Sequence, residues 1–89
     1  MYRIKELANM SGISIRTLHY YDQINLLKPS RIEENGYRLY DKGAVGRLQQ
    51  ILFLKELDFP LNEIKRILDD PYFDEMEALQ MQRKILVEK

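Results

Sequence analysis

The sequence predicts one small, mainly α-helical domain that carries a single β-hairpin. The chain has 89 residues, of which 45% are hydrophobic and 31% are charged, so it has room for one domain with a modest core. Apolar residues recur with helical spacing along most of the chain, and this period changes only around Asn35 and Gly36. Glycine and proline separate the periodic segments, so we expect several short helices rather than one long one.

The first two predicted helices are short and close together. Apolar residues with helical spacing predict a helix within residues 2–10. Gly12 ends that helix, and Ser14 is expected to cap a second helix from about Ile15 to Asn25. Two helices joined by a glycine-containing turn form a helix-turn-helix, in which the second helix protrudes and fits the major groove of DNA.

A hairpin is expected next. Asn35 and Gly36 lie between two extended segments and form a strong hairpin signal, because a type I′ turn requires positive φ at both central residues. Arg31 and Arg38 lie beside this turn. The hairpin would therefore form a wing that rests on the DNA backbone, or alternatively a cap over the core with solvated arginines.

Three further helices are expected after the hairpin. Asp41 is expected to cap the first of these, which reaches about Leu57 and is apolar over much of its girth. Residues 58–60 break it, and a short helix follows over about residues 61–68. Asp74 is expected to cap the last helix, whose apolar residues lack an obvious partner within the chain, so we expect the natural protein to continue.

Charge and composition exclude several classes of protein. The absence of cysteine excludes disulfides and thiolate metal sites, and one histidine with four scattered glycines supplies neither a phosphate loop nor a nucleophile–base pair. We therefore expect no enzyme, metal or cofactor. Residues 1–40 hold six Lys and Arg against four Asp and Glu, so the first half is favoured as the anion-binding surface. No membrane span or signal peptide is predicted, which fits a cytoplasmic protein.

The second helix has one polar face. The polar side chains of that face fall on a single arc: Arg16, His19, Tyr20 and Gln23. Ile15 and Leu18 lie on the opposite side. Arginine can bind phosphate or guanine with two hydrogen bonds, and tyrosine or histidine can reach base edges. A merely solvated face is the simpler alternative, but the hairpin that follows makes a DNA-binding helix the more specific interpretation.

Three motifs in this order resemble the N-terminal domain of MerR-type transcription regulators: "SIRTLHYYD", "NGYRLY" and "LDFPLNEI". The likeness is greatest to the multidrug- and thiopeptide-responsive branch of the family (Mta-like and TipA-like). It implies a winged helix-turn-helix with a second helical pair in residues 1–70. It also implies a linker and the start of a coiled-coil dimerisation helix in residues 71–89.

The resemblance also implies a function. Such regulators bind an inverted repeat of double-stranded promoter DNA as homodimers, and they act with RNA polymerase. By bending and untwisting a promoter whose recognition elements are too widely spaced, they often activate transcription. In this 89-residue chain we expect a monomer or a weak dimer.

The DNA contacts expected from the resemblance and from the polar residues of the second helix and hairpin are Ser14, Arg16, Thr17, His19, Tyr20, Tyr37, Arg38, Tyr40 and Lys55. The expected dimerisation residues are Met76, Leu79 and Leu86. His19 stands where many members have arginine, so the contact there should be weaker and sensitive to pH. Pro60 replaces the usual serine cap and is tolerable as a first helical residue.

Two other functions remain alternatives. The last helix could serve a protein-interaction module that binds a partner helix. A small excisionase-like architectural DNA-binding protein would use the same helix and wing without the last helix.

Overall fold

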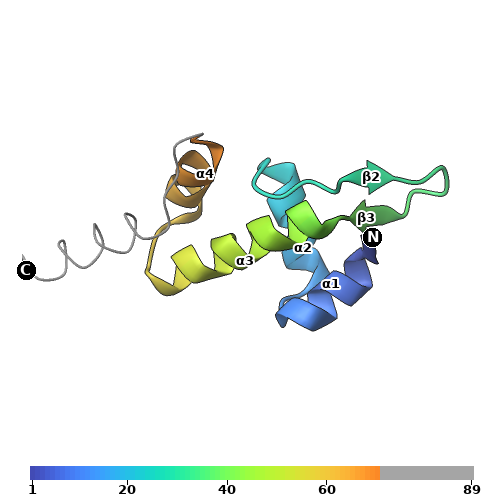
Figure 1. Ribbon diagram of the computed structural model, residues 1–89, viewed down its shortest axis with the longest axis horizontal. Helices are drawn as coiled ribbons and strands as arrows, with labels where there is room; N and C mark the ends of the chain where they lie inside the picture. Colours follow the sequence, from blue (N-terminus) through green and yellow to red (C-terminus); the bar gives the residue numbers. More distant parts are fainter. Residues whose placement is uncertain (71–89) are drawn as a thin grey trace, which may run out of the picture. The chain divides into compact units, whose positions relative to one another are not determined.

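The computed structural model describes residues 1–70 (Figure 1). Its elements are β1 (Tyr2–Arg3), α1 (Ile4–Ser11), α2 (Ile15–Gln23), β2 (Arg31–Ile32), β3 (Arg38–Tyr40), α3 (Lys42–Glu56) and α4 (Leu61–Asp69). This arrangement confirms the predicted mainly α fold with a small sheet. The described residues divide into two compact units, one of residues 1–52 and a second that begins at residue 53, and the division falls inside α3. The predicted linker and dimerisation residues Met76, Leu79 and Leu86 lie outside the described residues.

The helix-turn-helix forms through local capping at both ends of α1. The Glu6 carboxylate accepts a hydrogen bond from the backbone N–H of Arg3 at 3.1 Å, which satisfies a donor at the start of the helix. Gly12 ends the helix with a φ of 70°, and the N–H of Ile13 donates to the carbonyl of Ala8 at 3.2 Å. Only glycine adopts this left-handed conformation without steric cost, so the turn to α2 depends on Gly12.

The sheet has three strands rather than the two of the predicted hairpin. β1 pairs antiparallel with β3, with Tyr2 opposite Tyr40 and Arg3 opposite Leu39, and the strand order is β1-β3-β2. The sequence prediction was wrong in placing residue 2 in a helix. β2 pairs with only one side of β3. If residue 2 were helical, the backbone N–H and C=O groups on the other side of β3 would have no partner, so Tyr2 and Arg3 pair with them as a strand.

α2 begins where predicted and ends earlier. Ser14 Oγ accepts a hydrogen bond from the backbone N–H of Thr17 at 3.0 Å, which confirms the predicted N-cap. The helix ends at Gln23 and not at Asn25, because Asn25 has a φ of 60°. A left-handed asparagine just past the C-cap residue closes a helix, so Asn25 was a stop signal that the prediction missed.

The turn of the hairpin differs from the predicted type I′ turn. Gly36 has a φ of 86°, whereas the φ of Asn35 is not positive, so only one of the two residues has the conformation that a type I′ turn requires. The N–H of Gly36 donates to the carbonyl of Glu33 at 2.8 Å, and that of Glu33 donates to the carbonyl of Tyr37 at 2.9 Å. These bonds define a three-residue loop that ends in a left-handed glycine. Asn35 uses its side chain instead, since its Oδ1 accepts from the N–H of Tyr37 at 3.2 Å.

One apolar core holds the first unit together. Its buried side chains are Leu7, Ala8, Leu18, Tyr21, Leu26, Leu27, Tyr40, Ala44, Leu48 and Ile51. α1 packs against α2, β1 and β3. The Nε of Arg47 donates to the carbonyl of Leu26 at 2.7 Å, which ties α3 to the loop after α2. The core therefore supports α2 and the hairpin as parts of the same unit.

α3 begins as predicted, and α4 begins at Leu61, as the sequence indicated. The N–H of Ala44 donates to Asp41 Oδ1 at 2.8 Å, which confirms the predicted cap. α3 ends before Asp58, whose φ is 66°. Pro60 occupies the N-cap position and Leu61 is the first helical residue, so the proline stands just before the helix and removes no hydrogen bond from its interior.

Candidate nucleic-acid interface

The outer face of α2 is polar and open to solvent. Arg16, His19 and Gln23 are exposed, and Tyr20 keeps 48% of its surface accessible. Leu18 on the opposite side is fully buried. The structure therefore places the four predicted polar residues on one accessible surface, and their contact with DNA stays a prediction.

Ser14 and Thr17 are engaged with each other at the start of α2. Besides capping the helix, the Ser14 hydroxyl lies 2.9 Å from the Thr17 hydroxyl. Ser14 is exposed and Thr17 is half-buried. Each hydroxyl can still accept a further hydrogen bond, but the first role of this pair is to fix the end of the helix that would enter a groove.

Tyr37 at the wing carries a cation on its ring. Half of its surface is exposed, and the Arg3 guanidinium lies over the ring at 4.9 Å from its centroid. This is cation–π geometry. The sequence prediction missed Arg3 because it assigned that residue to a helix. Only the pairing of β1 with β3 brings Arg3 to the wing.

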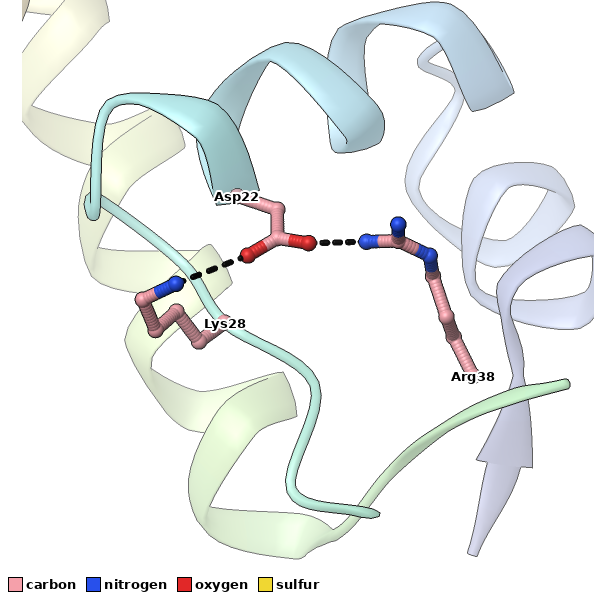
Figure 2. Close-up of polar contacts among 3 residues, drawn as sticks. All are labelled: Asp22, Lys28 and Arg38. Carbon is pink, nitrogen blue, oxygen red and sulfur yellow. Dashed lines mark hydrogen bonds and ion pairs between the residues drawn. The ribbon is translucent and has the colours of Figure 1, made fainter. Parts of the chain in front are cut away.

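Arg38, the other predicted wing contact, forms an ion pair with Asp22 of α2 (Figure 2). Arg38 Nη1 donates to Asp22 Oδ2, while Lys28 Nζ lies 3.1 Å from Asp22 Oδ1. The Asp22 side chain is 17% exposed, that of Arg38 29% and that of Lys28 60%. Both carboxylate oxygens are thus occupied by cations from different segments.

The ionisation of Asp22 reflects these contacts. Burial alone would raise the pKa of its carboxyl, but the hydrogen bonds from Lys28 and Arg38 outweigh burial. The pKa of Asp22 therefore lies below its ordinary value, and the carboxylate is charged at neutral pH. Sequence reasoning missed Asp22 as a functional candidate, because its partners are six and sixteen positions away.

Tyr40 was expected to contact DNA, and the structure contradicts this. The residue is fully buried, and its hydroxyl has no hydrogen-bond partner among the described residues. Burial raises the pKa of this hydroxyl above its ordinary value. Tyr40 lies on β3 between β1 and β2, so its side chain fills the core and is inaccessible to DNA.

Lys55 is exposed in the last turn of α3 and belongs to the second compact unit. Its predicted contact with the DNA backbone stays a prediction. Within residues 1–70, no group of His, Cys, Asp and Glu side chains is arranged to hold a metal ion. In the same part of the chain, no helix has the length and apolar character needed to span a membrane.

Residues 2–70 match the family model described as MerR HTH family regulatory protein. The chain belongs to the MerR HTH family. Over 88 residues this MerR domain is 56% identical to the HTH-type transcriptional activator mta of Bacillus subtilis (strain 168), covering 99% of the chain and 34% of that protein. It is 45% identical over 85 residues to the HTH-type transcriptional activator TipA of Streptomyces coelicolor, covering 96% and 34%. The predicted Mta and TipA branch is confirmed, and these relatives are named as activators, not as enzymes.

Solved structures of MerR proteins share this fold. The N-terminus of the multidrug transporter activator of Bacillus subtilis, MtaN, superposes with a TM-score of 0.92 at 55% identity, covering 99% of this chain and 83% of that one. HiNmlR, a MerR family regulator lacking the sensor domain and bound to promoter DNA, has a TM-score of 0.75 at 28% identity, covering 93% and 71%. EcmrR, in a DNA complex in EcmrR-RPo, has a TM-score of 0.78 at 30% identity, covering 98% and 32%.

The MerR chain spans about a third of the length of the curated relatives that it matches, 34% for both mta and TipA. The likeness therefore concerns the helix-turn-helix part of those proteins.

Proposed function

We propose that this chain is the DNA-reading domain of a MerR-type transcription regulator. The observation that carries the proposal is the exposed polar face of α2, held on a packed helix-turn-helix beside a three-stranded wing. HiNmlR, which has the same fold, was solved bound to promoter DNA. A protruding helix with arginine and tyrosine on its outer face suits the major groove.

We expect two kinds of DNA contact, one to base edges and one to phosphates. Arg16 and Tyr20 on α2 are the candidates for base edges, because both are exposed near the middle of the polar face. Arg3, Tyr37 and Arg38 at the wing are the candidates for phosphate, because the first two stack and the third is held against α2. The helix would supply specificity, and the wing would supply orientation and salt-dependent affinity.

The complete regulator is proposed to bind an inverted repeat as a dimer and to act in the cytoplasm together with RNA polymerase. The support is family membership and the DNA-bound EcmrR and HiNmlR structures. Bending and untwisting a promoter costs deformation energy, which the contacts of two paired domains would offset. A dimer also matches the two-fold symmetry of an inverted repeat.

The test is fluorescence anisotropy of the chain with the duplex upstream of its own gene, compared with a shuffled duplex of equal length at several salt concentrations. We expect tighter binding to the native duplex, with affinity falling steeply as salt rises. Absence of binding to both duplexes, also with a longer final helix, would reject DNA reading and favour the protein-interaction module. Equal binding to both duplexes with a bent product would favour an architectural DNA-binding protein.

A further inference from the structure

We propose that Asp22 is a positioning residue that fastens the wing to α2 and orients Arg38 toward a DNA phosphate. The proposal rests on the function proposed above and deepens it, since it names the residue that makes helix and wing act as one surface. Figure 2 shows the Asp22 carboxylate between Arg38 and Lys28, with one oxygen directed to each.

The position of Asp22 is restricted by its surroundings. Asp22 lies in the last turn of α2, where the backbone N–H of Asn25 donates to its carbonyl at 3.1 Å. Its side chain is 17% exposed, so its orientation is restricted by packing. Arg38 reaches it from β3, the central strand of the sheet. The ion pair therefore joins a fixed helix end to a fixed strand.

The ion pair leaves Arg38 able to bind an anion. Only Nη1 donates to Asp22, and a guanidinium carries five N–H donors in a fixed planar fork. Holding one nitrogen restricts the orientation of the planar group and so of the remaining donors. With one carboxylate between two cations, the three side chains carry a net charge of +1, so the cluster as a whole still attracts phosphate.

Positioning and simple charge give opposite expectations. A carboxylate near a DNA-binding surface repels phosphate, so on charge alone its removal should raise affinity. If Asp22 instead positions Arg38, then removing its charge frees the guanidinium and affinity falls. The sign of the change therefore separates the two roles.

The experiment compares Asp22→Asn with Glu34→Gln in the salt-dependent anisotropy assay with the native duplex. Glu34 is an exposed carboxylate in the wing loop, so its variant removes the same charge from the same unit without touching Arg38. We expect Asp22→Asn to weaken binding about tenfold, the lower end of what one charge-assisted hydrogen bond contributes, and Glu34→Gln to leave it unchanged or stronger. The salt slope of Asp22→Asn should fall by about one, as expected when one phosphate contact is lost.

A double-mutant cycle supplies the readout that a purely structural role would not change. In an Arg38→Ala background, Asp22→Asn should weaken binding no further, because there is no guanidinium left to orient. Asp22→Glu should restore part of the affinity and the salt slope. Circular dichroism and thermal unfolding of every variant establish that the fold is kept.

Four outcomes are decisive. Tighter binding of Asp22→Asn, equal to that of Glu34→Gln, would overturn the positioning role, as would an equal loss in the Arg38→Ala background. Failure of the wild-type chain to bind the native duplex would instead reject the proposed function itself. If Asp22→Asn does not fold, Arg38→Lys replaces it, since it keeps the charge but loses the planar fork; unchanged affinity would then overturn the proposal.

Discussion

Among single residues, Tyr40 combines a fully buried ring with a hydroxyl that has no partner among residues 1–70. Removing this hydroxyl loses no described hydrogen bond, so Tyr40→Phe should change the free energy of unfolding by less than about 1 kcal/mol. Tyr40→Ala should destabilise by about 3–5 kcal/mol, as in other large-to-small core substitutions. Urea unfolding measures both. A tenfold weaker DNA affinity of a stable Tyr40→Phe variant would contradict its assignment to the core.

Asp22 should contribute to acid sensitivity. Its pKa is below the ordinary value in the folded chain, so the unfolded chain binds the proton more readily. The stabilisation is therefore fully present above pH ~4 and is lost as pH falls through the folded pKa. Urea unfolding between pH 2 and pH 7 should show a steeper acid loss for wild type than for Asp22→Asn. Parallel curves would mean that the ion pair contributes nothing in solution. The pKa of Asp41 is also lowered, mainly by the hydrogen bond from the Ala44 N–H. Asp41 therefore contributes the same loss of stability in acid to wild type and to Asp22→Asn, and does not affect the comparison.

The two predicted arginine contacts should differ in kind. Arg16→Ala should reduce discrimination between native and shuffled duplexes by about 1–3 kcal/mol if Arg16 reads a base. Arg38→Ala should weaken binding to every duplex alike and lower the salt slope by about one. Anisotropy titrations at several salt concentrations measure both effects. Equal weakening of native and shuffled duplexes by Arg16→Ala would make Arg16 a backbone contact.

At the scale of elements, three helices end in the same way. α1, α2 and α3 are each followed by a residue with positive φ, namely Gly12, Asn25 and Asp58. After α2, the N–H of Leu26 donates to the carbonyl of Tyr21 at 2.8 Å. After α3, the N–H of Phe59 donates in the same way to the carbonyl of Leu54 at 3.2 Å. This pattern satisfies carbonyls that the last helical turn leaves open.

At these helix ends, the residue type at the position with positive φ should affect the stability of the folded chain. Gly12→Ala should destabilise by about 1–2 kcal/mol, because a Cβ is disfavoured in the left-handed region. Its Cβ would meet no atom within 4 Å, so backbone strain is the only penalty. Asp58→Gly should be neutral or stabilise by up to about 1 kcal/mol. Thermal unfolding measures both, and destabilisation by Asp58→Gly would point to a side-chain role for Asp58.

At the scale of the whole molecule, the oligomeric state of this chain depends on the predicted dimer seam. The expected seam residues, Met76, Leu79 and Leu86, belong to residues 71–89, which hold fewer than three heptads. Coiled coils usually need at least three to four heptads, so sedimentation of the 89-residue chain should give a monomer or a weak dimer at micromolar concentration. A single stable dimer at that concentration would contradict this prediction. A variant with Leu79→Asp serves as the monomeric control.

The sequence by itself determined the helices, their caps at Ser14 and Asp41, and the polar face of α2. Each of these features depends on side chains within about four positions of one another, which is the range of helical periodicity and capping. The same local motifs carried the resemblance to the MerR family. For this reason the class of fold and the protruding helix were predictable from the amino-acid sequence.

Only the tertiary structure decided that Tyr2–Arg3 is a strand, that Tyr40 is buried and that Asp22 holds Arg38. Asp22 and Arg38 are sixteen positions apart, and β1 pairs with a strand more than thirty positions away. Such partners are selected when the core closes, because backbone groups and charges must then be satisfied by whatever segment lies beside them. Periodicity within a short window contains no information about such long-range contacts. The contacts that support the candidate DNA surface could therefore be identified only in the folded chain.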